Sequence, residues 1–503
     1  MLRPKSLVPS KPNSRSDEAA DDFDVLRQVA AEAIDYRRSV DDRPLRPDAD
    51  YHQMVRAFDR PLPEDGLAAG ATIENLIATA EPGLNGMTGA RFFGWVLGGS
   101  HPVGVAADWL ASAWGQNCGN HHAAPAAAAI EDVASRWLLD ILDLPRACSV
   151  GFVTGATAAN FVGLAAARHA LLASSGWDVE KQGLFGAPPI NVLVGNDAHA
   201  TIFSALQFIG LGSERVTRLP TDDSGRIIVP SFLSALARCQ GPTIVIAQAG
   251  QINTGAFDPF SELAAACRQR PDTWLHVDGA FGLWARASKA KAHLTAGIDG
   301  ADSWATDGHK WLQVPFESGY VIVKDREAHR AAMTVAASYL PDCADHERNP
   351  TDYVPELSRR ARGFATWAMI RHLGRRGIAA MIERHCRLAR QMADRLAKEP
   401  GIEILNDVDL NQIIVRFGNG RQVEEDDDLT RAVIDRIQQD GTCFAGGASW
   451  RGRWVMRISC ISCSTTAKDA CRAVDAMIQA WRSVSDADGT NVRMRPGYQR
   501  SVS

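Results

Sequence analysis

Lys310 is the residue of this sequence whose setting most suggests chemistry. It follows His309 directly in the run Ser303–Trp311 (SWATDGHKW). A lysine amine forms an imine with an aldehyde cofactor, and desolvation or nearby cations activate it for that reaction. The apolar neighbours and His309 provide such surroundings. Because His-Lys-Trp also fits a lysine in a surface loop, the motif needs support from elsewhere in the chain.

A carboxylate at the end of a predicted strand gives the first support. Asp278 closes the run Trp274–Asp278 (WLHVD), and ligands of open α/β sheets bind at the carboxyl ends of strands. A carboxylate there can keep a pyridine nitrogen protonated, which makes the ring an electron sink. The alternative is an Asp that caps the helix after the strand.

Two further stretches fit the other parts of such a cofactor. The run Gly151–Thr157 (GFVTGAT) precedes a predicted helix, whose first N–H groups suit a phosphate, although a plain tight turn is the simpler alternative. His199 follows the predicted strand at 190–195, where an imidazole can stack on a ring or serve the structure alone. The order of phosphate loop, histidine, strand-end Asp and Lys is consistent along the chain. Together these residues predict pyridoxal 5′-phosphate (PLP).

Alternating helices and strands must position these residues. The sequence predicts helices at 131–142, 158–172 and 261–268, and strands at 190–195, 243–249, 273–277 and 319–323. This interleaving indicates an α/β domain with a large, mixed and mostly parallel sheet. After about residue 376 the pattern changes to a small α+β domain. We expect five parts: a disordered segment 1–16, an N-terminal helical segment 17–100, a large PLP-binding domain 101–375, a small C-terminal domain 376–482 and a flexible tail 483–503.

Composition and charge argue against several classes of partner. The 503 residues are 46% apolar and 22% charged with a net charge of −5, which gives no reason to expect nucleic acid or a membrane as a partner. The uncharged run 147–167 is long enough to span a membrane, but its Gly, Thr, Asn and Ser residues indicate a loop that leads into a buried helix. Ten scattered cysteines favour reduced thiols in the cytoplasm. Cys460 and Cys463 form a C-x-x-C without a second pair, so we expect core packing and no metal site.

On these motifs the sequence resembles the group II PLP-dependent decarboxylases, which include aromatic-L-amino-acid decarboxylase and glutamate decarboxylase. The resemblance extends from about Ala90 to Ser464, and its most specific motifs are His276–Ala280 (HVDGA) and Ala301–Lys310 (ADS-x4-GHK). It implies a PLP-dependent transferase fold of type I, like that of aspartate aminotransferase, in a homodimer. It also implies decarboxylation of an L-amino acid to the amine and CO2.

The resemblance assigns roles to matching positions. Lys310 would form the imine beside His309, and Asp278 would pair with the pyridinium. Ala280 and His199 would pack on the two ring faces. The phosphate would bind at Gly155, Ala156 and Thr157. Tyr339, 29 residues after Lys310, would protonate the substrate carbon once CO2 has left, unless it is a tyrosine packed on the surface of a loop.

Departures from the family pattern leave the substrate open. Gln251 replaces a usual Thr, and His121 and Ala124 replace an aromatic residue and a Ser. All of these positions border the substrate in relatives. Trp95 falls where relatives place an aromatic residue against the substrate side chain, which hints at an aromatic or apolar substrate.

Four further arginines are candidates for ionic contacts. Arg359, Arg360 and Arg362 with Trp367 reproduce the family's Arg-Arg-x-Arg-x4-Trp spacing, for which we expect an ionic or structural role. Arg457 is the nearest candidate for an arginine that binds a substrate carboxylate, as an aminotransferase would need.

Alternatives to decarboxylation stay open from sequence alone. The same fold supports aminotransferases and carbon–carbon lyases. A PLP-free binding protein is a third possibility, against which intact Lys310 and Asp278 argue. The amphipathic stretch Phe23–Arg38 is expected to clasp the second subunit, so that two chains build each active site.

Borohydride reduction of the PLP-loaded protein should fix the cofactor on the peptide that contains Lys310, because reduction converts the imine into a stable amine. Peptide mass spectrometry locates the adduct. Cofactor found on a different lysine would contradict the assignment.

Overall fold

The computed structural model describes residues 23–334, 347–418, 420 and 422–493, with side chains up to residue 487. The chain divides into two compact units, Met1–Gly86 and Met87–Ser503. None of the helices within the described ranges is both long and apolar enough to cross a membrane.

The first unit contains the helices α1 (Asp24–Ser39), α2 (Tyr51–Phe58) and α3 (Ala69–Ala80). A capping box starts α2, in which Asp50 accepts the Gln53 N–H and the Gln53 side chain accepts the Asp50 N–H. No residue of these three helices is buried, so apolar side chains such as Leu26 and Val55 are exposed. The helix expected from the pattern at 23–38 is present as α1.

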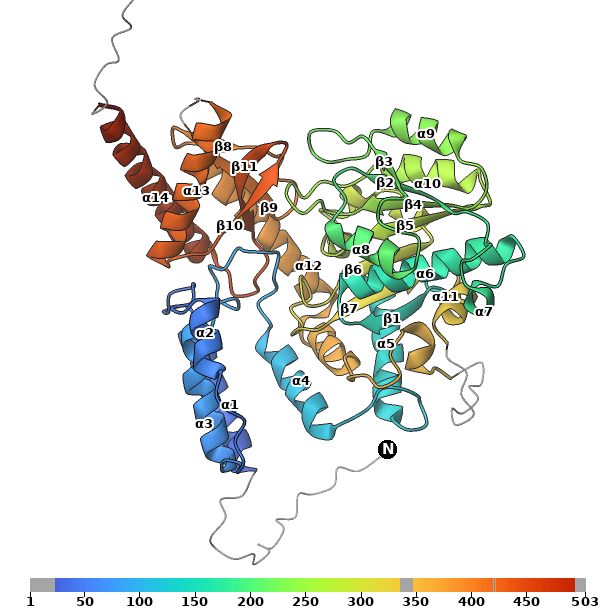
Figure 1. The fold of residues 1–503 in the computed structure, drawn as a ribbon, viewed down its shortest axis with the longest axis horizontal. Helices are drawn as coiled ribbons and strands as arrows, with labels where there is room; N and C mark the ends of the chain where they lie inside the picture. The colour runs from blue at the N-terminus through green and yellow to red at the C-terminus, as the bar shows by residue number, and fades with distance from the viewer. Residues whose placement is uncertain (1–22, 335–346, 419, 421, 494–503) are drawn as a thin grey trace, which may run out of the picture. The chain divides into compact units, whose positions relative to one another are not determined.

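A seven-stranded sheet forms the centre of the second unit, in the order β1-β7-β6-β5-β4-β2-β3 (Figure 1). Strand β7 is antiparallel to β1 and β6, and the other neighbouring pairs are parallel. The large, mixed and mostly parallel sheet is therefore as predicted. The strands are β1 (Ser149–Val153), β2 (Asn191–Gly195), β3 (Thr217–Leu219), β4 (Thr243–Gln248), β5 (Thr273–Asp278), β6 (Ser303–Asp307) and β7 (Gly319–Val323).

Strand β1 lies within the run 147–167, for which we expected a loop before a helix. That expectation is wrong for residues 149–153, which pair with β7 about 170 residues later in the chain. The helix that follows is present as α6 (Ala156–Ser174) and is largely buried.

Helices cover both faces of this sheet, which explains why its strands are continuous apolar runs. On β4, Ile244 and Ile246 point to one face and Val245 and Ala247 to the other. The first face packs against α6, α8 (Ala200–Phe208) and α11 (Arg326–Met333). The second packs against α5 (Pro125–Ile141), α9 (Val229–Arg238), α10 (Phe260–Arg268) and α12 (Gly363–Leu396).

The C-terminal part of the second unit builds a four-stranded antiparallel sheet in the order β10-β11-β9-β8. Its apolar core is formed with the last part of α12 and with α13 and α14. Helix α12 is interrupted at Gly374, whose φ of 61° is a left-handed conformation that glycine adopts readily. The bounds are β8 (Ile402–Ile404), β9 (Gln412–Phe417), β10 (Gly446–Trp450), β11 (Arg453–Ser459), α13 (Val423–Asp440) and α14 (Ala467–Arg493).

The topology brings the ends of distant segments together. Strands β1, β2, β5 and β6 point in the same direction, so their carboxyl ends lie along one edge of the sheet. Gly195, Asp278 and Asp307 end three of these strands, and α6 begins three residues after the last residue of the fourth. This edge is where ligands bind in sheets of this kind.

Candidate active site

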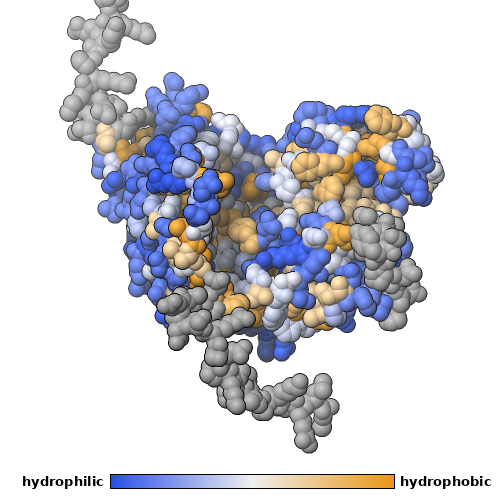
Figure 2. Space-filling view, turned by 60° about the horizontal axis from the view of Figure 1, so that its bottom comes forward, coloured by the Kyte–Doolittle hydropathy of each residue, from blue (hydrophilic) through white to orange (hydrophobic). Residues whose placement is uncertain are grey.

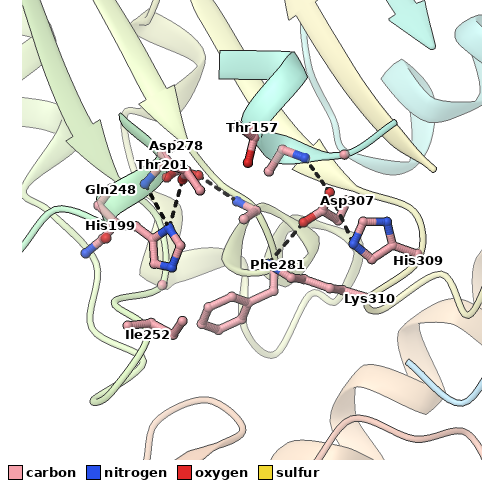
Figure 3. A pocket seen from close by; sticks show the side chains of 14 residues that line it. Thr157, His199, Thr201, Gln248, Ile252, Asp278, Phe281, Asp307, His309 and Lys310 are labelled. Carbon is pink, nitrogen blue, oxygen red and sulfur yellow. Dashed lines mark hydrogen bonds and ion pairs between the residues drawn. The ribbon is translucent and has the colours of Figure 1, made fainter. Parts of the chain in front are cut away.

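A cavity of about 230 Å³ lies at this edge (Figure 3). Loops after several strands and the first turn of α6 supply its walls. Its lining residues are Gly155, Ala156, Thr157, His199, Thr201, Gln248, Gly250, Ile252, Asp278, Ala280, Phe281, Asp307, His309 and Lys310. All eight residues predicted to bind the cofactor are in this set.

The loop between β1 and α6 is shaped by close backbone contacts. A Cβ atom on Gly319 would lie 2.5 Å from the Cα of Gly155, so β7 and this loop can approach this closely only because Gly319 has no side chain. A Cβ on Gly155 would meet the ring of His309 at 3.1 Å. The first N–H groups of α6, from Ala156 onward, are thereby held against the cavity, where the helix dipole favours an anion.

Asp278 lies at the end of β5 and is 5% exposed. Its Oδ1 accepts the N–H of Ala280 at 3.2 Å, and no cation among the described residues forms an ion pair with it. Burial raises the pKa of this carboxyl, and the nearby His199 and Lys310 act in the opposite direction. A buried carboxylate without an ionic partner can bind a cation that a ligand supplies.

His199 is the N-cap residue of α8 and lines the same cavity. In Figure 3 it lies on the side of the pocket away from His309. Its Nδ1 contacts the hydroxyl of Thr201 at 2.8 Å. Burial lowers the pKa of the imidazole, while Asp278 raises it and Lys310 and Arg457 lower it further. A neutral, flat ring is therefore presented to whatever occupies the cavity.

Lys310 is paired with a carboxylate that sequence reasoning missed. Its Nζ lies 3.0 Å from Oδ2 of Asp307, and Nε2 of His309 lies 3.6 Å from Oδ1 of the same residue. Burial lowers the pKa of His309, whose ring packs on Phe316. Asp307 ends β6 as Asp278 ends β5, but no strand was predicted at 303–307, so the sequence pattern did not single this residue out.

Gln313 fixes the chain just after Lys310. This fully buried residue has a φ of 61°, and its Oε1 accepts the N–H groups of Gly99 at 2.7 Å and Cys463 at 3.0 Å. Its Nε2 donates to the carbonyls of Ile461 and Lys310 at 2.8 and 3.1 Å. One amide thus joins three segments that are far apart in sequence around the lysine.

Arg457 enters the same region from β11 of the small sheet. Burial lowers its pKa, its Nε has no hydrogen-bond partner, and no described acid forms an ion pair with it. It is close enough to His199 to lower the pKa of that imidazole. A guanidinium without an ionic partner can bind an anion.

The three residues predicted to touch the substrate, Trp95, His121 and Gln251, are not among the residues that line this cavity. Trp95 is half-exposed and packs on Phe92 and Phe444. The Oε1 of Gln251 accepts the N–H groups of residues 253 and 254 and so shapes its own loop.

His121 contacts Asn349 through Nδ1 at 2.9 Å and Glu347 through Nε2 at 3.2 Å, instead of the cavity. Tyr339, the predicted proton donor, lies outside the described residues.

The arginine cluster has structural contacts. Arg359 is buried, pairs with Glu131 at 2.8 Å and donates to the carbonyls of residues 118 and 152. Arg360 pairs with Asp108 at 2.8 Å, and Arg362 with Glu317 at 3.3 Å. Trp367 stacks on Trp137. In the C-x-x-C, Cys460 is fully buried, and burial raises the pKa of its thiol to about 12.

The cavity fits PLP by the chemistry of its donors. The amine of Lys310 suits the aldehyde, the unpaired carboxylate of Asp278 suits a protonated ring nitrogen, and the start of α6 suits the phosphate.

Comparison with known proteins agrees with this fit. Residues 52–417 match the model of the pyridoxal-dependent decarboxylase conserved domain. The chain belongs to this family. It is 26% identical over 457 residues to an aromatic-L-amino-acid decarboxylase of Bacillus atrophaeus, covering 88% of this chain and 93% of that protein. It is also 26% identical over 469 residues to tryptophan decarboxylase 1 of Oryza sativa subsp. japonica, with 88% and 90% covered.

Solved structures confirm the type I fold of this decarboxylase. The crystal structure of Oryza sativa TDC with PLP and tryptamine superposes with a TM-score of 0.85 at 22% identity, covering 93% of this chain and 99% of that one. The crystal structure of mouse CSAD gives 0.84 at 20% identity, with 91% and 98% covered. The protein is a PLP-dependent carboxy-lyase that acts on an amino acid.

Proposed function

We propose that this decarboxylase acts on an L-amino acid with an aromatic or apolar side chain, and that Lys310, Asp278, His199 and Arg457 do the main work of its site. The observation that carries the assignment of these residues is a pair of opposite charges, the buried Asp278 and the half-buried Arg457, that have no ionic partner among the described residues. PLP supplies a cation for the first, and the α-carboxylate of an amino acid supplies an anion for the second.

The lining of the cavity supports the substrate class. Ile252, Phe281 and Ala280 provide apolar surface, and Lys310 is the only lysine or arginine among the lining residues. Because Lys310 is paired with Asp307, the described lining residues offer no unpaired lysine or arginine to an acidic side chain. The relatives named for aromatic amino acids point the same way, whereas others are named acidic amino acid decarboxylases.

Each of these residues would have a distinct role. Bound PLP supplies the electron sink for the bond to CO2. Asp278 holds the ring nitrogen protonated, neutral His199 covers one ring face, and the first N–H groups of α6 hold the phosphate. Arg457 orients the substrate by its carboxylate. Tyr339 stays our candidate for returning a proton to the substrate carbon, because a phenol is neutral at pH 7 with a reference pKa of about 10.

We also propose a homodimer in which the first unit and the segment around Trp95 serve the partner's site. Exposed apolar side chains support it, on α1 to α3 and on α4 (Pro102–Trp114), where Trp109, Leu110 and Trp114 are exposed. Orange, apolar patches interrupt the hydrophilic surface of the face drawn in Figure 2. Light scattering should give twice the chain mass, and an active monomer would contradict the proposal.

Free thiols at every described cysteine support a cytoplasmic location, which cell fractionation would test.

A screen of the natural amino acids for CO2 release, with amines, keto acids and aldehydes measured in parallel, tests the substrate class. We expect CO2 and amine in equal amounts from aromatic or large apolar substrates. Preferential turnover of aspartate or glutamate would contradict the proposed class.

Arg457→Gln should raise the KM of the preferred amino acid about 10- to 100-fold, because a charge-assisted contact with the carboxylate is lost. The product amine carries no carboxylate, so its inhibition constant should stay within about threefold. Arg453→Gln, on the exposed part of the same strand, is the matched control. Equal weakening of substrate and amine would show that Arg457 contacts something else.

Asp278→Asn should retain PLP but lose activity on the order of 10²-fold or more, because a neutral amide cannot hold the ring nitrogen protonated. Absorbance of the bound cofactor checks its retention, and CO2 release checks the rate. Turnover near the wild-type level would show that Asp278 is a structural cap.

A further inference from the structure

Asp307 contacts two groups that the cofactor also needs. Its Oδ1 accepts the N–H of Ala156 at 2.6 Å, and its Oδ2 lies 3.0 Å from Nζ of Lys310 (Figure 3). The carboxylate is 2% exposed, at the end of β6. It thus bridges the first turn of α6 and the lysine across the cavity wall.

The contact with Ala156 concerns the phosphate directly. An N–H at the start of a helix has no partner within the helix, and in this chain the carboxylate of Asp307 takes that role. A single N–H cannot give a full hydrogen bond to two acceptors at once. A phosphate that binds there also meets a buried negative charge of its own sign.

We propose that Asp307 competes with the cofactor phosphate for the start of α6, and thereby limits the affinity of the chain for PLP. This inference rests on the proposed binding of phosphate at the start of α6. Phosphate displaces the carboxylate from the N–H of Ala156, while Asp307 stays beside the nitrogen of Lys310. The chain therefore holds Lys310 paired before cofactor arrives and exchanges PLP more readily than a site without this acid.

Two features show why a neutral residue at this position would behave differently. An amide oxygen is a weaker acceptor for an N–H than a carboxylate, so it yields the N–H of Ala156 to phosphate more easily. It also carries no charge to repel a phosphate dianion. Asparagine has nearly the shape of Asp307, so the packing beside Gly155 and His309 should be kept.

The test compares Asp307→Asn with the wild type and with Asp302→Asn in the full-length, cofactor-stripped protein. Asp302 is the matched control, because it precedes the same strand, accepts one backbone N–H from Leu275 at 2.8 Å and does not line the cavity. Isothermal titration calorimetry with inorganic phosphate, PLP and pyridoxal gives the affinities. Pyridoxal carries the aldehyde without the phosphate.

We expect Asp307→Asn to bind inorganic phosphate and PLP at least tenfold more tightly, with a clearly smaller gain for pyridoxal and no gain in Asp302→Asn. Equal or weaker phosphate binding by Asp307→Asn would overturn the proposal and make Asp307 a structural support of the loop. An equal gain for pyridoxal and PLP would also overturn it, because the effect would then come from Lys310 alone.

A second variant and a separate signature distinguish failure of this proposal from misfolding and from failure of the site assignment. If Asp307→Asn does not fold by circular dichroism, Asp307→Ser, a smaller uncharged acceptor, is measured in its place against the same expectation. Failure of the underlying site assignment has a different signature. In that case the wild type itself would show no binding of phosphate at this site, and borohydride would not attach PLP to Lys310.

Discussion

The buried carboxylate of Asp278 is the constraint on which the rest of the site depends. Its strand places it in the interior with one backbone N–H as a direct partner. Removing such a charge from water is costly, and burial accordingly raises its pKa. In the proposed site, a ring nitrogen that stays protonated beside it would supply the missing cation, which would couple cofactor binding to the stability of the cavity. The same interaction makes the ring an electron sink, which links the energetics of folding to the chemistry.

The small sheet also bears on the site. Arg457 comes from β11, and the amide of Gln313 ties the loop at Cys463 to the loop that carries Lys310. A displacement of the small sheet would therefore move both the anion site and the lysine. Because Gln313 is bonded mainly to backbone groups, its position depends on the fold of three segments and not on any single neighbour.

Much of the cavity could be predicted because its residues lie near the carboxyl ends of strands, which the sequence pattern partly reveals. Asp278 ends an apolar run, Lys310 stands in a distinctive His-Lys motif, and parallel strands deliver their carboxyl ends to one edge. The contacts of Gln313 and His121 could not be predicted in this way, because each is decided by residues far away in the chain. His121 illustrates the point, since its partners are residues 347 and 349. Strand β1 was missed for the same reason, as its five residues are defined by pairing with β7.

The charges of the site also bear on how a catalytic cycle ends. Arg457 lies near His199 and has no acidic partner among the described residues, so in the proposed site a substrate carboxylate would remove an unfavourable state of the free protein. Loss of CO2 would remove that anion and return the half-buried guanidinium to an unpaired condition. The amine product is then bound without the contact that helped its precursor to enter, and a fresh amino acid can replace it with a gain in free energy. Decarboxylation would thus remove the carboxylate by which the substrate is selected. Loss of that contact would favour release of the product.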